Sequence, residues 1–444
     1  MRRLALDYLV DWLVSDRRLP LVIRGARQVG KTWMIRELAK NSSKELIEFN
    51  FESNPQSASL FASNDPKEIL LSLSSALGRD IVPKDTVLFL DEIQAVPQLF
   101  SKLRWFAEEM PELATVAAGS LLEFVLAEHS FSMPVGRITF MHVEPLSFEE
   151  FLLARGKEQL QKYLADFSFK RVIPEALHEQ LMTLFKEYTL VGGMPAAVAD
   201  WCAHQSLMKV GRVHHDLLAT YRGDFSKYRN RIALERLEEA SFSVPRMLGQ
   251  KFVFSQVNSG VPSEQVKQAI RLLNLARVCH RISSTGADGV PLASQTKPKF
   301  FKEIMLDVGL VCSALGVTLH QLASVSELTL VNSGAIAEQV VGQLLRTLEP
   351  FYIEPALFYW QRDERGSEAE VDYVIQYASK IIPVEVKAGK TGTLKSLQLF
   401  MKMKNPDLAV RICSAPPRIE KRDYVLLSIP FYLCGQLHRL LSEN

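Results

Sequence analysis

The stretch LPLVIRGARQVGKT, residues 19–32, decides the fold of the first part of the chain. Its first half is a short apolar run typical of a buried strand. Its second half, from Gly25 to Thr32, fits the phosphate-binding pattern GxxxxGK[ST], and a helical pattern begins near Gly30. A strand that leads through such a loop into a helix is the context that makes this motif specific. The sequence therefore predicts a P-loop that binds nucleotide phosphates.

Each residue type in this loop has a chemical role. Glycines let the backbone turn tightly so that successive N–H groups face the phosphates, and the helix N-terminus adds a favourable dipole. The lysine neutralises charge on the β- and γ-phosphates, and the threonine hydroxyl is a magnesium ligand. We expect ATP with Mg²⁺ as the bound cofactor, held by Gly25, Ala26, Arg27, Gln28, Val29, Gly30, Lys31 and Thr32.

Polar residues at the ends of later strands are candidates for the chemistry of hydrolysis. Asp91 and Glu92 end the run VLFLDE, so we expect Asp91 to hold magnesium through water and Glu92 to orient or activate the attacking water. Ser120 follows the next strand, where it either approaches the γ-phosphate or caps a helix. Arg137, in PVGRITF, is either an arginine finger, acting in its own chain or in a neighbouring subunit, or a solvated residue at a strand start.

The pattern around the P-loop predicts an α/β domain. Short apolar runs alternate with stretches of helical period, which indicates a parallel sheet covered by helices on both faces. The runs lie at residues 19–25, 44–51, 85–91, 113–119 and 137–143.

Length, charge and cysteine usage limit the class of protein. A chain of 444 residues is too long for one ordinary core, and a formal net charge of +2 means that any nucleic-acid-binding face must be local. The five cysteines contain no CxxC pair, which argues against a zinc site or a disulfide framework. Asp7 and Asp11 interrupt what would be the core of a signal peptide, and no apolar run approaches about 20 residues. We expect a cytoplasmic protein with no membrane partner.

The middle of the chain is predicted to be helical and then to form a winged helix-turn-helix. The helical part contains the turn VGGMPAAV and a basic tract at 221–231, which is more often a solvated face than a DNA groove. The winged helix is predicted from the helix SEQVKQAIRLLNLA (263–276) and a hairpin with a glycine-rich tip at 276–293. Lys267 and Arg271 on that helix would contact DNA phosphates.

A second set of acidic residues lies near the C-terminus. Asp372 is in the strand EVDYVI, and Glu385 and Lys387 lie two apart in IPVEVK, so these two face the same side of a strand. Two carboxylates and a lysine can bind Mg²⁺ and prepare a water molecule for phosphodiester hydrolysis, which makes all three candidate catalytic residues. Glu338, in the helix GAIAEQVV, would join Asp372 and Glu385 as a metal ligand, and Gln398 is a weaker candidate for holding the water or the backbone. The alternative is a ladder of salt bridges on paired strands.

These motifs, taken in order, resemble a known family. The runs GARQVGKT, LFLDEIQ, AAGSLL, GRITF, PLSFEEFL, VGGMPAAV, GAIAEQVV, EVDYVI and IPVEVK together look like the prokaryotic AAA-like ATPases that carry a C-terminal domain of unknown function. The resemblance implies an ATPase domain, a winged helix-turn-helix and a terminal domain similar to the PD-(D/E)xK nucleases. It matches the ATP site at Gly30, Lys31, Thr32, Asp91 and Glu92, and the nuclease motif at Asp372, Glu385 and Lys387. Leu121 departs from the family, because many relatives have a second small polar residue there.

The sequence thus predicts an α/β protein with four parts. They are an AAA-like P-loop ATPase domain at 1–155, a helical region at 156–232, a winged helix-turn-helix at 233–325 and a restriction-endonuclease-like α/β domain at 326–444. The predicted function is Mg²⁺-dependent hydrolysis of ATP to ADP and phosphate, coupled to a DNA-binding module with a candidate nuclease site. The alternative is a nucleotide-dependent switch or scaffold with an inactive nuclease-like domain, acting on a protein partner or within a homo-oligomer.

Overall fold

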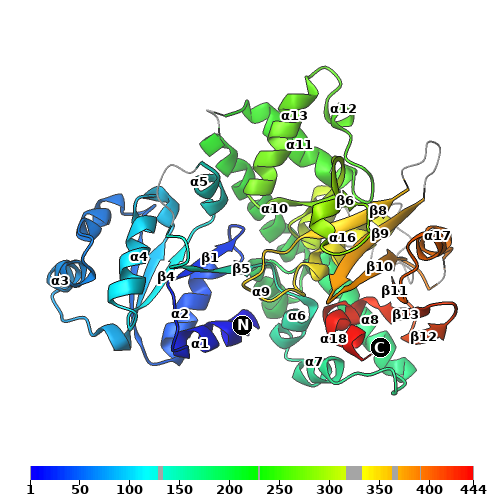
Figure 1. Cartoon of the computed structure of the whole chain (residues 1–444), viewed down its shortest axis with the longest axis horizontal. Helices are drawn as coiled ribbons and strands as arrows, with labels where there is room; N and C mark the ends of the chain where they lie inside the picture. Colours follow the sequence, from blue (N-terminus) through cyan, green and yellow to red (C-terminus); the bar gives the residue numbers. More distant parts are fainter. Residues whose placement is uncertain are drawn as a thin grey trace. The chain divides into compact units, whose positions relative to one another are not determined.

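The computed structural model describes residues 2–128, 134–228, 231–316, 333–362, 369–390 and 392–443. The chain forms two compact units (Figure 1). The N-terminal unit consists of Arg2–Glu144 with Pro350–Glu354, and the C-terminal unit consists of Pro145–Glu349 with Pro355–Asn444.

The N-terminal unit is built on a five-stranded sheet in which all strands run parallel. The strand order is β2-β3-β4-β1-β5, so the P-loop strand lies between β4 and β5. Each strand falls inside one of the five predicted runs. β3 and β4 are buried along their whole length, whereas the edge strand β2 contains Glu45 and Glu48 and is mostly half-buried. The strands are β1 (Leu21–Gly25), β2 (Glu45–Asn50), β3 (Thr86–Asp91), β4 (Ala114–Ala118) and β5 (Thr139–Val143).

Helices of the N-terminal unit begin close to the predicted positions. They are α1 (Ala5–Val14), α2 (Lys31–Asn41), α3 (Pro66–Leu77), α4 (Leu99–Glu109) and α5 (Leu122–Glu128), with short 3₁₀ segments at Pro55–Phe61, Pro83–Asp85 and Ile93–Ala95. Asp65 caps α3 by accepting a hydrogen bond from the Lys67 N–H. Ile69 of α3, Leu103 of α4 and Leu88 of β3 belong to one buried apolar cluster, which fixes these helices on the sheet.

A short segment from the distal part of the chain completes the N-terminal unit. The His142 N–H of β5 donates a hydrogen bond to the carbonyl of Phe351 (2.7 Å), and the Phe351 ring lies 5.7 Å from that of Tyr8. Arg24 of β1 also pairs with Glu354 at 3.5 Å. This return of the chain could not be predicted, because a five-residue segment carries no periodicity of its own.

The C-terminal unit contains most of the helices of the chain. The described ones are α6 (Phe148–Ala154), α7 (Glu158–Ala165), α8 (Glu175–Val191), α9 (Pro195–His204), α10 (Leu207–Asp224), α11 (Leu234–Arg246), α12 (Phe254–Val257), α13 (Ser263–Leu275), α14 (Val308–Ala314), α16 (Ser333–Leu345), α17 (Lys395–Lys404) and α18 (Leu437–Ser442). Shorter 3₁₀ segments lie at Phe225–Tyr228, Leu292–Gln295 and Phe431–Gln436. Within the described residues, no helix is both long and apolar enough to cross a bilayer.

An eight-stranded mixed sheet forms the core of the C-terminal unit (Figure 1). Its order is β12-β13-β11-β10-β9-β8-β6-β7. The strands are β6 (Cys279–Thr285), β7 (Thr296–Met305), β8 (Leu357–Gln361), β9 (Glu370–Tyr377), β10 (Lys380–Val386), β11 (Leu408–Cys413), β12 (Arg418–Lys421) and β13 (Val425–Pro430).

The predicted hairpin of the winged helix forms, but it does not stand apart as a wing. β6 and β7 pair antiparallel as predicted, and β6 also pairs in parallel with β8, Ile282 lying opposite Leu357. The hairpin is therefore one end of the sheet that also contains the candidate nuclease strands. The expectation of a separate domain at 233–325 missed this pairing, because its partner strand lies about 75 residues further along and sequence periodicity does not report such contacts.

A buried polar cluster joins three motifs of the C-terminal unit. Asp307, which is 0% exposed, accepts hydrogen bonds from the N–H groups of Gly193 (2.6 Å), Gly309 (2.9 Å) and Leu310 (3.2 Å). Gly193 in turn accepts a hydrogen bond from the Leu146 N–H at 2.7 Å. The turn VGGMPAAV and the run PLSFEEFL are therefore connected to the end of β7, which gives both motifs a structural role.

Candidate functional site

The P-loop lies between β1 and α2, as predicted. β1 ends at Gly25 and α2 begins at Lys31, and Gly30 caps the helix with a φ of 96°, a conformation that favours glycine. The buried Lys31 ammonium donates to the carbonyls of Gly25 (2.9 Å) and Ala26 (2.8 Å). The lysine thus rests on the loop that is expected to surround the phosphates, at the N-terminus of a helix suited to anions.

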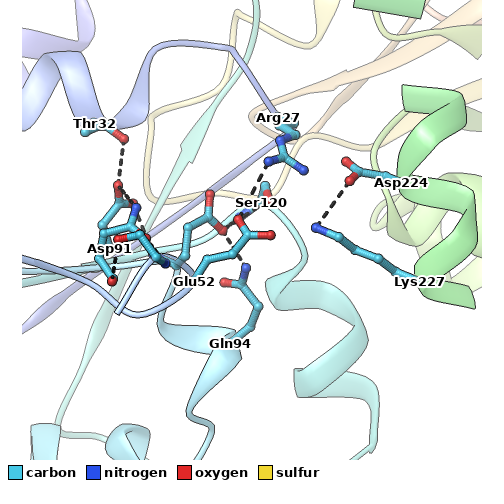
Figure 2. A network of polar contacts seen from close by, with 11 residues as sticks. Arg27, Thr32, Glu52, Asp91, Gln94, Ser120, Asp224 and Lys227 are labelled. Carbon is cyan, nitrogen blue, oxygen red and sulfur yellow. Dashed lines mark hydrogen bonds and ion pairs between the residues drawn. The ribbon is translucent and has the colours of Figure 1, made fainter. Parts of the chain in front are cut away.

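Thr32 and Asp91 are brought together from different elements. The Thr32 hydroxyl, in the first turn of α2, donates to Asp91 Oδ2 at 3.0 Å, and Asp91 ends β3 (Figure 2). Burial, and then the neighbouring Glu92 carboxylate, raise the pKa of Asp91, while the hydrogen bond from Thr32 acts in the opposite direction. A hydroxyl and a buried carboxylate beside the lysine form the oxygen set that Mg²⁺ prefers.

Glu92 is held by two partners in this structure. Its Oε2 accepts hydrogen bonds from both the N–H and the hydroxyl of Ser120, each at 3.2 Å, and from the amide of Gln94. Glu92 itself has a φ of 49°, an uncommon conformation that turns the chain directly after β3. Ser120 and Gln94 therefore set the position of the carboxylate that was predicted to orient water. Gln94 was not predicted, although it lies only two residues from Glu92.

Two arginines have contacts around the P-loop. The Arg27 guanidinium lies 3.6 Å from a carboxylate oxygen of Glu52. The buried Arg3 donates to the carbonyls of Val29 and Glu144, both at 2.9 Å. It therefore connects the P-loop to the residue that follows β5. Arg3 was not singled out from the sequence, because a basic residue near the N-terminus looks like an ordinary surface residue.

Arg137 lies at the wrong edge of the sheet to reach the phosphates of its own chain. β1 and β5 are parallel with Leu21 opposite Thr139, so Arg137 is near the start of β1 while the P-loop is at its end. Five strand residues span about 16 Å. The guanidinium instead pairs with Glu108 of α4 at 2.7 Å. The expectation of an arginine finger acting in cis is therefore wrong, and a role in a neighbouring subunit stays a prediction.

The candidate nuclease residues lie on adjacent strands of the C-terminal sheet. β9 and β10 are antiparallel, and Asp372 Oδ2 accepts a hydrogen bond from the Val386 N–H at 2.7 Å. Lys387 Nζ donates to Glu385 Oε1 at 2.6 Å. Burial, and then the Asp372 carboxylate, raise the pKa of Glu385 to about 7. The sheet thus places Asp372 against the backbone between Glu385 and Lys387, while their role in a metal site stays a prediction.

An irregularity in β9 lies at the candidate site. Phe358 of β8 is opposite Val374, but Trp360 is opposite Val371, so β9 has one extra residue between these pairs. Such a bulge re-aims side chains and occurs often beside functional sites. Asp372 falls within this bulge.

Glu338 and Gln398 are placed differently from the other predicted residues. Glu338, on α16, accepts a hydrogen bond from Lys302 Nζ at 3.2 Å, and Lys302 also pairs with Glu370. Gln398 is on the exposed surface of α17. Among the described residues, no three or more His, Cys, Asp or Glu side chains are arranged to hold a metal ion. Lys302 was missed because a lysine in a β-strand predicts a solvated residue.

Three family models match consecutive parts of the chain. Residues 17–152 match a family described as an AAA domain. Residues 182–321 and 333–432 match families described as domains of unknown function, DUF8612 and DUF4143. The first match supports the prediction of a nucleotide-binding ATPase domain in the N-terminal unit, whereas the third has no nuclease description, so the nuclease-like resemblance stays a prediction. No curated protein matches the sequence.

Solved structures share only remote likeness with the chain. The Aeropyrum pernix ORC1 protein in complex with DNA is 13% identical, with a TM-score of 0.29 over 72% of this chain and 92% of that one. PCH-2 of C. elegans is 12% identical, with a TM-score of 0.28 over 44% of this chain. The match spans 59% of the length of PCH-2. The Drosophila ORC bound to DNA is 15% identical, with a TM-score of 0.24 over 70% of this chain and 85% of that one.

Proposed function

We propose that the N-terminal unit binds ATP with Mg²⁺ and hydrolyses it to ADP and phosphate. The observation that carries this proposal is the hydrogen bond between Asp91 and Thr32, the residue that follows Lys31 in the first turn of α2. These three groups come from two elements that are far apart in sequence, and a P-loop ATPase requires this combination. An ordinary glycine-rich turn would have no reason to place a buried carboxylate against the threonine.

The contacts suggest how each side chain acts. Lys31 donates to two loop carbonyls, and in the proposed complex its ammonium would also contact charged phosphate oxygens. Thr32 and Asp91 would hold the magnesium ion, which neutralises charge that develops on the phosphates. Glu92, positioned by its bonds from Ser120 and Gln94 to Oε2, would accept a hydrogen bond from the attacking water with its remaining acceptor positions.

Phosphate release tests this proposal directly. The purified full-length chain is expected to release phosphate from ATP with excess Mg²⁺, and EDTA should reduce the rate to background because the hydroxyl and carboxylate oxygens need the ion. Bound nucleotide is followed in parallel with a fluorescent ATP analogue. Nucleotide binding without any turnover in Mg²⁺ or Mn²⁺ would contradict the hydrolysis part of the proposal.

We further propose that α13 and the β6–β7 hairpin bind DNA. α11, α12 and α13 pack together, and α11 and α13 also pack on the hairpin strands. Lys267 and Arg271 lie on the exposed side of α13. Lys267 has an intrahelical partner, Glu264 at 3.3 Å, so it would have to exchange this partner for a phosphate. In the basic tract 221–231, Lys227 pairs with Asp224 at 3.2 Å.

The double variant Lys267→Ala with Arg271→Ala is expected to weaken duplex binding for all sequences. Two lost phosphate contacts should reduce the slope of log affinity against log salt by about 2. Fluorescence anisotropy with a labelled duplex at several salt concentrations measures this slope. Lys162→Ala with Lys170→Ala, two exposed lysines of the same unit, is the matched control. An equal decrease in both double variants would show that binding depends on overall charge and not on α13.

The candidate nuclease site has one feature that suits a divalent cation. Glu385 is 4% exposed, and its Oε2 has no hydrogen-bond partner among the described residues. A buried carboxylate oxygen without a partner is unfavourable unless a cation binds it. A metal ion there would be held by Asp372 and Glu385 and would activate a water molecule for phosphodiester hydrolysis, while Lys387 would position that water.

A nucleotide-dependent switch with an inactive nuclease-like domain is the second candidate function. It is favoured by the Lys302 ammonium, which already pairs with Glu338 and Glu370 beside this site. Cleavage of single-stranded, duplex, branched and RNA substrates with Mn²⁺ or Mg²⁺ distinguishes the two candidates. Cutting that disappears in Asp372→Ala would support the nuclease. Intact ATP turnover without any cutting would support a switch that acts on a protein partner or within a homo-oligomer.

A further inference from the structure

Lys302 is a buried lysine next to the candidate nuclease site. Its side chain is 1% exposed, and its ammonium lies 3.2 Å from Glu338 Oε2, pairs with Glu370 and lies 5.3 Å from the centre of the Tyr359 ring. Burial alone would lower the pKa of Lys302, but the carboxylates of Glu338 and Glu370, together with that of Asp372, outweigh this effect and raise it. Lys302 therefore stays charged at neutral pH.

Glu338 is enclosed by its neighbours. Its Oε2 accepts a hydrogen bond from Lys302, and its Oε1 faces Gly249, where an added Cβ would lie only 3.1 Å away. A Tyr373 hydroxyl also donates to the Glu338 carbonyl at 2.8 Å, which fixes this turn of α16. The carboxylate is therefore oriented toward the lysine.

Lys302 contacts two of the four carboxyl groups in a buried cluster. The cluster consists of four carboxyl groups and two lysines. The members are Glu338, Glu370, Asp372, Glu385, Lys302 and Lys387. Glu338 and Glu370 are the carboxyl groups that Lys302 contacts, and the carboxylate oxygen without a hydrogen-bond partner among the described residues is Oε2 of Glu385.

We propose that Lys302 is a positioning residue whose ammonium holds Glu338 and Glu370, so that a divalent cation in the C-terminal site is bound by Asp372 and Glu385 without Glu338. This inference rests on the metal site of the proposed function. It differs from the expectation that Glu338 completes the metal shell, and it assigns a role to a lysine that belongs to no motif.

Manganese binding tests this assignment without relying on cleavage. The full-length chain carries Asp91→Asn, which removes the magnesium ligand of the ATP site, and free Mn²⁺ is measured by electron paramagnetic resonance in the absence of nucleotide. Asp372→Asn is expected to weaken Mn²⁺ binding by at least about 30-fold, whereas the matched charge removal Glu338→Gln should change it by less than about threefold, since only ligands interact directly with the ion.

A double-mutant cycle identifies the part played by Lys302. Lys302→Met should release Glu338 toward the metal and tighten Mn²⁺ binding by about tenfold, and Glu338→Gln in that background should then reverse the gain. Lys302→Arg keeps the charge and serves as the control. If Lys302→Met fails to fold, as seen by circular dichroism, the comparison of Glu338→Gln with Asp372→Asn decides alone.

Two results would overturn the inference and they are distinguishable. Equal weakening by Glu338→Gln and Asp372→Asn would show that Glu338 is a ligand, leaving the metal site intact but removing the role of Lys302. Absence of Mn²⁺ binding in the Asp91→Asn chain and in Lys302→Met would instead show that the C-terminal site holds no metal, which contradicts the proposed nuclease site as well.

Discussion

Glu92→Gln is expected to lower ATP turnover at least about 100-fold while nucleotide affinity stays within a few-fold of wild type. The reason is that a positioned carboxylate contributes about 10²- to 10⁴-fold when it accepts or orients a proton in the transition state. Glutamine keeps the size of the side chain, and it can retain bonds to Ser120 and Gln94 like those that Glu92 Oε2 now makes. Lys31→Ala should instead lose both turnover and binding, because its ammonium contacts the phosphates in the ground state as well. Phosphate release and equilibrium binding of a fluorescent ATP analogue separate the two effects.

Glu109→Gln is the control for this pair. Glu109 is an exposed glutamate at the end of α4, so the same chemical change there should leave turnover and affinity unaltered. Turnover of Glu92→Gln within threefold of wild type would show that Glu92 is not the residue that acts on water. Loss of nucleotide binding in Glu92→Gln would show that the carboxylate supports the structure of the nucleotide site. The hydrogen bond from the Ser120 N–H to Glu92 is the contact through which it would do so.

The N-terminal sheet could be predicted strand by strand because its signals are local. Each buried parallel strand is an uninterrupted apolar run such as TVLFLD, and the P-loop fixes which strand precedes the first long helix. The residues that hold ATP and magnesium were found for the same reason, since Gly30, Lys31 and Thr32 are consecutive. Asp91 ends a strand, where a carboxylate following apolar residues is easy to see.

Contacts between distant residues could not be predicted in this way. Nothing near Arg3 indicates that it will donate to the Val29 carbonyl, and nothing near Lys302 indicates that the strand is buried. The wing was misjudged because hairpin pairing is a local signal but the parallel pairing of β6 with β8 is not. Arg137 was placed by motif order, which gives the strand but not the edge of the sheet at which the side chain lies.

The turn VGGMPAAV shows how a motif can be recognised before its purpose is known. Its sequence suggested a tight turn and nothing more. In the structure, Gly192 has a φ of 73°, and an added Cβ would lie 2.0 Å from Asp307 Oδ1. Gly193 donates its N–H to the same carboxylate. The glycines are thus required by an aspartate more than a hundred residues away, and this predicts that Asp307 is a critical residue for stability.

Asp307→Ala is expected to destabilise the C-terminal unit by about 3–4 kcal/mol. The substitution leaves the N–H groups of Gly193, Gly309 and Leu310 buried without an acceptor, and each such group contributes an unfavourable 1–3 kcal/mol or so when the protein cannot rearrange. Asp307→Asn should have an intermediate effect, because it keeps one acceptor oxygen but turns an amide toward donors. Urea unfolding monitored by tryptophan fluorescence measures both variants.

The control for Asp307 is an aspartate without buried partners. Asp216 of α10 has a side chain that is 84% exposed, so Asp216→Ala should change the free energy of unfolding by less than about 0.5 kcal/mol. If the free energy of unfolding of Asp307→Ala is also within about 1 kcal/mol of wild type, water molecules must satisfy the three N–H groups in place of the carboxylate. The turn would then not depend on Asp307. A large decrease in the free energy of unfolding for Asp307→Ala, with a small one for Asp216→Ala, would establish that one buried carboxylate holds VGGMPAAV, the end of β7 and the start of α14 together. This contact explains why two glycines are found side by side in that turn.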